Sequence, residues 1–239
     1  MSIQSKKILA LIPARGGSKG LPRKNALDFC GRPLIAWTID AALKSRYVDA
    51  VAVSTDNDEI SAVSRSAGAS VPFKRPAKLA TDRASSMDVV LHAMRYFEEQ
   101  GNDFDILALL QPTSPLRKTR HLDAALEFFN RKKARAVLSV TEAEHPPAWM
   151  NQLPPDLCMK NFVQHADRKK NRQVLGKYYR LNGAIYIADW NFLKKSEDWF
   201  SPKTFAYVMD RVSSTDIDTL EDFQFAEYLR SGASALRCG

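Results

Sequence analysis

ILALIPARGGSKGLPRKN, residues 8–25, joins an apolar run to a small and basic turn. The first five residues of this segment are all apolar, which predicts a strand buried on both faces of a parallel sheet. Glycines and cations follow directly after Pro13. Because glycine has no Cβ, backbone N–H groups in such a turn can converge on an anion. The segment therefore predicts a phosphate-binding turn at the end of the first strand.

Three cations of this turn, Arg15, Lys19 and Lys24, can bind phosphate oxygens through charge-assisted hydrogen bonds. Two common phosphate loops are excluded. The spacing GxxxxGK[ST] is absent, and the adjacent Gly16 and Gly17 do not fit GxGxxG. A solvated basic turn is the alternative. We favour a ligand site because open α/β sheets bind ligands where their strands end.

Alternating apolar patterns along the chain predict an α/β fold, with a Rossmann-like, mainly parallel sheet flanked by helices. A short, turn-rich link is expected at residues 26–31, before Pro33 begins a helix. Strands are expected at residues 8–12, 50–54, 70–73, 106–110, 136–140, 183–188 and 205–209. Helices are expected at residues 33–42, 60–67, 86–97, 122–129 and from residue 220.

Residues 142–180 break this pattern, because prolines cluster there and the apolar periodicity is poor. Trp149, Phe162 and Tyr178 make the segment more apolar than a disordered linker usually is. We predict a core formed by residues 1–141 and 181–239, with residues 142–180 as an insertion that packs against another surface.

The overall composition fits one large domain of 239 residues with a formal net charge of +8. This charge suits a phosphate-bearing ligand, and no nucleic-acid-binding motif accompanies it. Cys30, Cys158 and Cys238 are widely spaced, which predicts reduced thiols rather than a zinc site or disulfide framework. No signal peptide or membrane segment is evident, so we expect a soluble, cytoplasmic protein with no membrane or nucleic-acid partner.

Further motifs extend along nearly the whole chain. They are STD (54–56), RPAKLATDRASS (75–86), LLQPTSPLR (109–117), RLNGAIYI (180–187) and DIDTLEDF (216–223). With the first turn, they resemble the motifs of the CMP-sialic acid synthetases, also called acylneuraminate or nonulosonic acid cytidylyltransferases, in the family's order. The resemblance implies transfer of CMP from CTP to the anomeric hydroxyl of a nine-carbon acidic sugar, with release of pyrophosphate. It also implies Mg²⁺ or Mn²⁺ as cofactor and a homodimer in which the insertion is a dimerisation arm.

Asp216 and Asp218 form the sharpest acidic pair. In an extended segment they point to the same side and can share a hard cation. Helix capping is the alternative, with Asp218 or Thr219 as the cap and Asp222 completing a capping box. The resemblance implies that Asp216 and Asp218 bind the metal and are catalytic.

The resemblance also implies a nucleotide site. Its residues are Ala14, Arg15, Gly16, Lys19, Lys24, Asn25, Arg75 and Ser86. Arg15 and Lys19 would act catalytically on the phosphates, and Asn25 would help to select cytosine. A turn residue, a surface cation and a helix N-cap are the alternatives for Asn25, Arg75 and Ser86.

The sugar is assigned to five residues by the same resemblance: Gln111, Arg172, Tyr186, Trp199 and Phe200. Gln111 follows a predicted buried strand, and the guanidinium of Arg172 could bind the sugar carboxylate in a fork. Core packing is the alternative for Tyr186.

One departure concerns the acceptor. Many sialic acid enzymes have a lysine shortly after the EHP segment, where this chain has Ala148 and Trp149. Legionaminic, pseudaminic or 3-deoxy-octulosonic acid therefore remain alternatives to N-acetylneuraminic acid. A catalytically silent nucleotide-binding protein and a basic nucleic-acid binder are alternatives of other classes.

Overall fold

The computed structural model describes residues 3–167, 171 and 174–232. Within them, one six-stranded sheet has the order β4-β1-β5-β7-β6-β8. Its strands are β1 (Ile8–Pro13), β4 (Ala50–Ser54), β5 (Ile106–Leu109), β6 (Ala136–Glu142), β7 (Tyr179–Asp189) and β8 (Thr204–Val208). β7 is antiparallel to both of its neighbours, whereas the other neighbouring pairs are parallel. The prediction of a mainly parallel sheet is confirmed.

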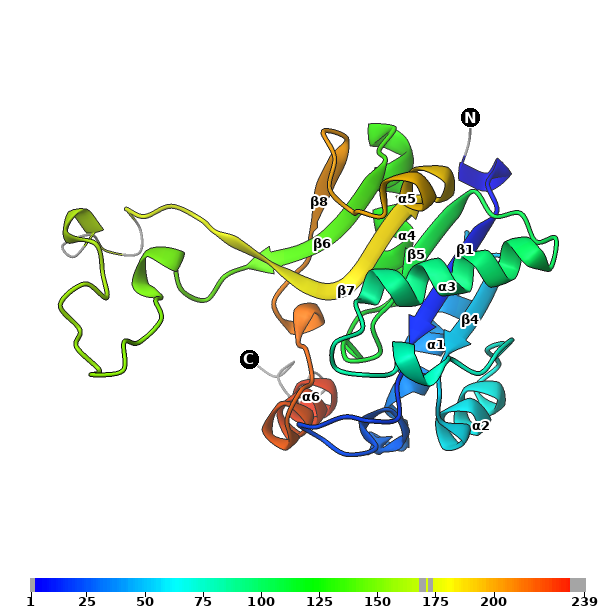
Figure 1. The fold of residues 1–239 in the computed structure, drawn as a ribbon, viewed down its shortest axis with the longest axis horizontal. Coiled ribbons are helices and arrows are strands. Elements are labelled where there is room, and N and C mark those ends of the chain that lie inside the picture. The colour runs from blue at the N-terminus through cyan, green and yellow to red at the C-terminus, as the bar shows by residue number, and fades with distance from the viewer. Residues whose placement is uncertain (1–2, 168–170, 172–173, 233–239) are drawn as a thin grey trace.

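Helices cover both faces of this sheet (Figure 1). They are α1 (Leu34–Leu43), α2 (Asp58–Ser66), α3 (Ser86–Glu99), α4 (Thr119–Lys132), α5 (Trp190–Ser196) and α6 (Leu220–Gly232). The alternating side chains of β1 serve the two faces. Ile8 and Ile12 pack in a core that includes α1, α2 and α4, whereas Leu9 and Leu11 pack in a core with α3 and α5.

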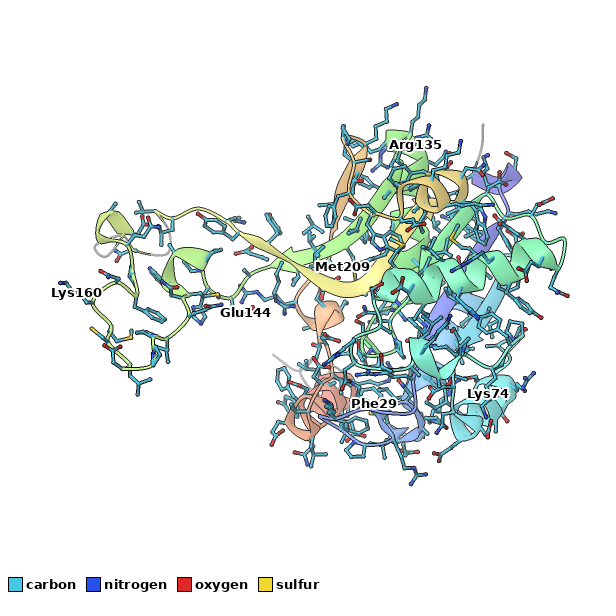
Figure 2. All side chains as sticks on the ribbon, viewed as in Figure 1. Phe29, Lys74, Arg135, Glu144, Lys160 and Met209 are labelled. Atoms are coloured by element: carbon cyan, nitrogen blue, oxygen red, sulfur yellow. The ribbon has the colours of Figure 1, made fainter. Side chains whose placement is uncertain are left out.

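A third apolar cluster fixes α6 to the turn after β1. Leu21 from that turn and Phe29 pack with Phe223 of α6 and with Ile217, which precedes the helix. Phe29 is fully buried and meets Phe223 edge to face, with ring centroids 5.3 Å apart. Figure 2 shows Phe29 on the side of the molecule where α6 lies. The cluster therefore brings Asp216 and Asp218, which flank Ile217, next to the turn.

Three local differences from the sequence prediction have physical causes. Residues 70–73 do not form a strand: Ser70 makes an isolated bridge to Ala52 and Lys74 makes another to Thr55, and Pro72 between them has no N–H to donate to a ladder. The expected link at residues 26–31 contains half of a small hairpin, β2 (Asp28–Phe29) with β3 (Arg32–Pro33), whose turn residues Cys30 and Gly31 both have positive φ. The short helix α5 was not predicted. Its cap is Asp189, which accepts a hydrogen bond from Phe192 N at 2.8 Å.

Short 3₁₀ helices complete the regular structure. They are η1 (Ile3–Ser5), η2 (Lys24–Ala26), η3 (Ala77–Leu79), η4 (Pro147–Trp149), η5 (His165–Asp167) and η6 (Val212–Ser214). Among the helices of the described chain, none is both long and apolar enough to cross a bilayer. Cys30 and Cys158 are exposed free thiols, and Cys238 lies outside the described residues.

A pronounced bulge interrupts β7. Leu138 of β6 pairs with Tyr186, but two residues later Val140 pairs with Leu181, so residues 182–185 bulge opposite Ser139. The buried Asn182 holds this bulge: its Oδ1 accepts from Ser139 Oγ at 2.5 Å, and its Nδ2 donates to Ser214 Oγ at 2.8 Å. These bonds fix β7 to β6 and to η6.

Between β6 and β7 the chain leaves the sheet as a protruding arm, residues 143–178 (Figure 1). Glu144 lies near its base and Lys160 far from the core (Figure 2). At the base, both ends of the guanidinium of Arg180 donate to the Glu144 carboxylate, at 3.3 and 3.4 Å. The division into a core and a dimerising insertion stays a prediction, since one chain does not test what the arm contacts.

Candidate active site

A cavity of about 510 Å³ opens where β1 and β5 end. Eight of the predicted site residues line it: Arg15, Lys19, Lys24, Asn25, Arg75, Ser86, Gln111 and Asp218. Ser18, Gly20, Asp82 and Thr113 also line it and were not predicted. A space of this size is typical of small-molecule sites. The fold thus gathers residues from four separate sequence motifs around one cavity.

Two predicted nucleotide residues, Ala14 and Gly16, hold the turn in place from outside the cavity. The backbone N–H of Ala14 donates to Ser54 O at 2.9 Å, and that of Gly16 donates to Asp56 Oδ1 at 2.9 Å. A Cβ on Gly16 would lie 2.8 Å from side-chain atoms of Asn57. The close approach explains the glycine, and it ties the turn to the STD motif that follows β4.

Arg15 and Lys19 share one carboxylate, that of Asp82. Arg15 Nη2 lies 2.7 Å from Asp82 Oδ1, and Lys19 Nζ lies 2.6 Å from Asp82 Oδ2. The hydrogen bonds from Lys19 and Arg15 lower the pKa of Asp82, so its carboxylate is charged at neutral pH. The two predicted phosphate-binding cations therefore lie together, and the single carboxylate of Asp82 offsets one of their two positive charges.

Arg75 is a buried anchor and not a surface cation, so that alternative is wrong. Its Nε donates to Ser54 Oγ at 3.0 Å, and its Nη2 donates to the carbonyl of Ser54. Burial lowers the pKa of Arg75 to about 10, which leaves it a cation at neutral pH. A buried cation at the cavity wall adds positive potential where an anionic ligand would lie.

Asn25 lines the cavity with an unused acceptor. Its Nδ2 donates to Arg15 O at 3.4 Å, while its buried Oδ1 has no hydrogen-bond partner. An unpaired buried acceptor costs free energy until a donor reaches it. The arrangement suits a ligand that presents an N–H group to this wall.

Ser85 and Ser86 divide two tasks between them. Ser85 is the N-cap of α3, where its Oγ accepts from Asp88 N at 3.0 Å. Ser86 is the first residue of the helix and lines the cavity. The alternative that Ser86 is the N-cap is therefore wrong.

The structure also shows which residues near the acidic pair cap the terminal helix. Thr219 and Asp222 form the reciprocal bonds of a capping box: Thr219 N donates to Asp222 Oδ2 at 2.9 Å, and Asp222 N donates to Thr219 Oγ1 at 3.2 Å. The carboxylate of Asp218 is not needed as a cap. It lines the cavity instead, with a side chain that is 76% exposed.

Asp216 and Asp218 flank the buried Ile217, and of the two only Asp218 lines the cavity. The Oδ1 of Asp216 is buried without a partner. Burial raises the pKa of Asp216, and the negative charge of Asp218 adds to this effect. Lys24, predicted as a phosphate ligand, instead donates its Nζ to Asp218 Oδ1 at 3.1 Å and to the carbonyl of Ile217. An unpartnered oxygen beside a second carboxylate fits a hard divalent cation.

Gly20 lets the turn approach this pair. A Cβ at Gly20 would lie 2.3 Å from the backbone oxygen of Asp218, which cannot move aside easily. The described residues contain no group of three or more His, Cys, Asp or Glu side chains suited to a metal. A metal here would therefore have two protein carboxylates and fill its other positions with water or substrate, as Mg²⁺ commonly does.

Gln111 follows β5 and faces the bulge of β7. A Cβ at Gly183, where φ is +69°, would lie 2.4 Å from Gln111 Oε1. Arg117 is fully buried and ties the two strands together, since its Nη1 donates to Ala184 O at 2.6 Å and to Gln111 O at 3.1 Å. Burial lowers the pKa of Arg117 to about 9. Gly183 and Arg117 thus fix the place of Gln111.

Among the described residues predicted to bind the sugar, Tyr186, Trp199 and Phe200 do not line the cavity. Tyr186 and Trp199 pack edge to face with ring centroids 5.4 Å apart, and Trp199 is buried in the core. Core packing, the alternative for Tyr186, is thus at least part of its role. Phe200 is 61% exposed. Arg172 lies outside the described residues.

Sequence reasoning missed Asp82, Gly20, Gly183 and Arg117. Asp82 and Arg117 lie inside motifs quoted above. The only local signals for a role in the site were the cations near Asp82 and the TSPLR segment that ends at Arg117. The residues around Gly183 do not indicate that a side chain there would clash with Gln111, because the two are 72 positions apart in the chain.

Known proteins are similar to this chain in sequence and in fold. Residues 9–182 match a family model described as Cytidylyltransferase. The chain belongs to the cytidylyltransferase family. This membership confirms the resemblance predicted from the motifs, and enzymes of the family typically require a divalent cation.

Two relatives match this cytidylyltransferase along almost their whole length. The pseudaminic acid cytidylyltransferase of Campylobacter jejuni is 37% identical over 229 residues, which cover 93% of this chain and 96% of the relative. The CMP-N,N'-diacetyllegionaminic acid synthase of Legionella pneumophila is 37% identical over 226 residues, with the same coverage.

A third relative is longer. The N-acylneuraminate cytidylyltransferase of Escherichia coli is 40% identical over 221 residues, which are 92% of this chain but 51% of the relative. The chain thus spans about half the length of that protein. A solved structure of CMP:2-keto-3-deoxy-manno-octonic acid synthetase, complexed with CTP, superposes with a TM-score of 0.69 at 18% identity and covers 95% of this chain and 99% of its own. This likeness supports the fold alone.

Proposed function

We propose that this cytidylyltransferase transfers CMP from CTP to the anomeric hydroxyl of a nonulosonic acid and releases pyrophosphate. The observation that carries the proposal is the cavity, where Arg15, Lys19, Asn25 and Asp218 meet at the carboxyl ends of β1 and β5. The relatives that match along nearly their whole length carry the names of enzymes for acids of this class.

CTP would bind along the turn after β1. Arg15 and Lys19 bind its phosphates through charge-assisted hydrogen bonds. The unpartnered Oδ1 of Asn25 accepts from the exocyclic amino group of cytosine, which a uracil base lacks. Ser86 does not cap α3, so its hydroxyl is available to bind the nucleotide.

A divalent cation, Mg²⁺ or Mn²⁺, would be held by Asp216 and Asp218. When bound, such an ion neutralises charge that develops on the phosphates. Lys24 supports the pair from the protein side, because its buried ammonium already balances part of the negative charge of Asp218. Burial raises the pKa of Asp216, and a bound cation would oppose this effect by favouring the ionised carboxylate.

The reaction forms a bond between the anomeric oxygen and the α-phosphorus and breaks the bond from that phosphorus to the bridging oxygen of pyrophosphate. The proton of the anomeric hydroxyl passes to solvent water as this bond forms. Positioning supplies most of the catalysis, since a fixed hydroxyl and a fixed phosphate react without the entropy loss of a free encounter. Arg15 and Lys19 stabilise the negative charge on the departing phosphates.

The sugar would lie on the Gln111 side of the cavity. Gln111 hydrogen-bonds the sugar, and Arg172 binds its carboxylate. Tyr186, Trp199 and Phe200 shape the apolar side of the acceptor pocket. The exposure of Phe200 and the absence of these aromatics from the cavity of one chain are consistent with a pocket completed by a second chain.

That second chain, we propose, is another copy of this protein, with residues 142–180 as the dimerisation arm. The arm carries Leu157 and Val174, each more than 60% exposed, and large apolar side chains that protrude in this way are typical of an interface. The exposed thiols of Cys30 and Cys158 fit a reducing, cytoplasmic location.

One experiment tests this function. Purified protein is given CTP, Mg²⁺ and in turn N-acetylneuraminic, legionaminic, pseudaminic and 3-deoxy-octulosonic acid, and pyrophosphate release is measured. We expect release with at least one nine-carbon acid and little with UTP in place of CTP. Release with none of the acids, despite tight CTP binding, would support the silent nucleotide-binding alternative.

A further inference from the structure

Asp82 occupies an unusual position for an acidic residue, inside a cavity built for an anion. It lies between η3 and α3, and its two carboxylate oxygens take one cation each: Oδ1 lies 2.7 Å from Arg15 Nη2 and Oδ2 lies 2.6 Å from Lys19 Nζ. Both cations come from the turn after β1, and all three residues line the cavity. The side chain of Asp82 is 44% exposed, so it can swing into solvent without opening the core.

This carboxylate makes the contacts that a phosphate group would make. Two oxygens, each accepting from a different cation, are the geometry expected of a phosphate bound by Arg15 and Lys19. A phosphate and Asp82 therefore compete for the same donors. The lowered pKa of Asp82 keeps the competitor charged at every pH used for an assay.

We infer that Asp82 is a specificity-determining residue, an internal competitor that only a polyphosphate displaces from Arg15 and Lys19. This inference rests on the proposed function, in which those cations bind CTP. A single phosphate would exchange two charge-assisted contacts for two of the same kind, and so would gain little. A polyphosphate brings more charge and more oxygens than the carboxylate it replaces, so its binding outweighs the exchange.

After the reaction the exchange is reversed, and Asp82 replaces the phosphate oxygens on Arg15 and Lys19. Once CMP has been transferred, pyrophosphate must leave Arg15 and Lys19. Asp82 can take back each cation as a phosphate oxygen releases it, so the cations are never left unpaired. The residue thus weakens pyrophosphate binding and favours its departure.

The test measures binding of inorganic tripolyphosphate and pyrophosphate to the wild-type protein and to Asp82→Asn by calorimetry. Because two exposed ion pairs are removed as competitors, we expect Kd to fall roughly three- to tenfold for both ligands. Inhibition of the forward reaction by added pyrophosphate should strengthen by a similar factor. Asp82→Glu, which keeps the charge, should behave like the wild type.

Asp58→Asn is the matched control. Asp58 is also an exposed carboxylate paired with a cation, Lys74 at 2.9 Å, but it lies outside the cavity. Its removal changes the net charge equally, and Kd should stay within about twofold because this exposed pair involves neither Arg15 nor Lys19. A merely structural role for Asp82 would weaken binding in Asp82→Asn, whereas competition tightens it.

The outcomes separate this inference from the proposed function. Equal or weaker tripolyphosphate binding by Asp82→Asn, or equal tightening by Asp58→Asn, would overturn the inference even if the wild type releases pyrophosphate from CTP. Tighter binding only by Asp82→Asn would support it, even if no sugar acid proves to be a substrate.

Discussion

The cavity and the arm adjoin the same sheet, but they differ in how many of their side chains find a partner within one chain. In the cavity, charged groups already have partners: Asp82 joins Arg15 and Lys19, and Lys24 joins Asp218. In the arm, large apolar side chains protrude. Met150, Leu153, Leu157, Met159, Val174 and Tyr178 are 40% to 69% exposed. Arg15, Lys19 and Lys24 in the cavity already have carboxylate partners, whereas the large apolar side chains of the arm remain exposed.

This difference indicates what each region needs. A ligand in the cavity has to exchange with internal partners, so binding there selects for charge and geometry. The arm offers apolar area that gains free energy when any matching surface covers it, about 25 cal/mol for each Å² removed from water. Substitutions in the cavity should therefore change chemistry and leave assembly intact. Substitutions in the arm should change assembly, and should affect chemistry only through what the partner adds to the acceptor pocket.

Asp218→Ala should have the largest effect, on the cavity alone. Loss of one of the two metal carboxylates should reduce CMP transfer by about a thousandfold or more, in line with the several kcal/mol that a catalytic metal supplies. The rate of pyrophosphate release with saturating CTP measures this. Full activity in the variant would contradict the metal assignment.

Asp218→Asn serves as its control for folding. Alanine leaves the buried ammonium of Lys24 with fewer partners, whereas asparagine keeps an oxygen that can accept its hydrogen bond. Both variants should have the dimerisation behaviour of the wild type in light scattering. If only Asp218→Ala lost activity, Asp218 would be holding Lys24 in place and not binding a metal.

Gly183→Ala tests the contact between the bulge of β7 and Gln111, which lines the cavity. The new Cβ would meet Gln111 Oε1 at 2.4 Å and force a positive φ on alanine. Since a misplacement of about 1 Å can cost a hundredfold in rate, we expect kcat/KM for the sugar to fall roughly ten- to hundredfold. Kd for CTP should change little, because the turn after β1 is not touched.

Gly101→Ala is the control that separates the effect of backbone strain from the effect of a clash with Gln111. Gly101 also has a positive φ, +70°, but a Cβ there would meet nothing within 4 Å. It should lower the free energy of unfolding by about 1–2 kcal/mol, the cost of a left-handed alanine, with normal kinetics. An equal loss of kcat/KM in both variants would mean that strain, and not the position of Gln111, limits the reaction.

Replacing Leu157 and Val174 together by Glu tests the arm. Charges on two of its most exposed apolar positions should convert the proposed dimer into a monomer, measured by light scattering. If the partner completes the acceptor pocket, kcat/KM for the sugar should fall about tenfold while Kd for CTP stays within about twofold. Phe225→Glu, at an exposed position on α6, is the control and should remain dimeric. A dimer that survives the double change would place the interface elsewhere.

The cavity was more predictable from sequence than the arm, for a physical reason. The strand at residues 8–12 is apolar throughout because it is buried on both faces, and the turn after it is small because the chain packs closely there. Constraints of this kind act on residues that are adjacent in the sequence, so the local sequence pattern reveals them. They were sufficient to predict Arg15, Lys19 and Lys24 as cavity residues, whereas Asn25 was assigned by the family resemblance.

What sequence reasoning missed depends on contacts between distant positions. Lys24 carries no local sign that its partner is Asp218, 194 positions later. The bulge in β7 depends on Ser139 and Ser214 around Asn182, so a continuous strand at residues 183–188 was expected. The two serines at 85 and 86 could not be told apart either, because helix entry differs by only one residue.

The smallest predicted effects distinguish those two serines. Ser85→Ala removes the N-cap of α3 and should lower the free energy of unfolding by about 1 kcal/mol, which is a loss of about 2–4 °C in Tm for a chain of this size. Its Kd for CTP should not change. Ser86→Ala should do the opposite: Tm stays constant, while Kd rises roughly two- to tenfold because a hydroxyl that faces the cavity is lost. Thermal unfolding and calorimetry on the pair measure both quantities. If Ser85→Ala weakened CTP binding as much as Ser86→Ala, α3 would be positioning the site as a whole, and the separation of cap from ligand contact would be wrong.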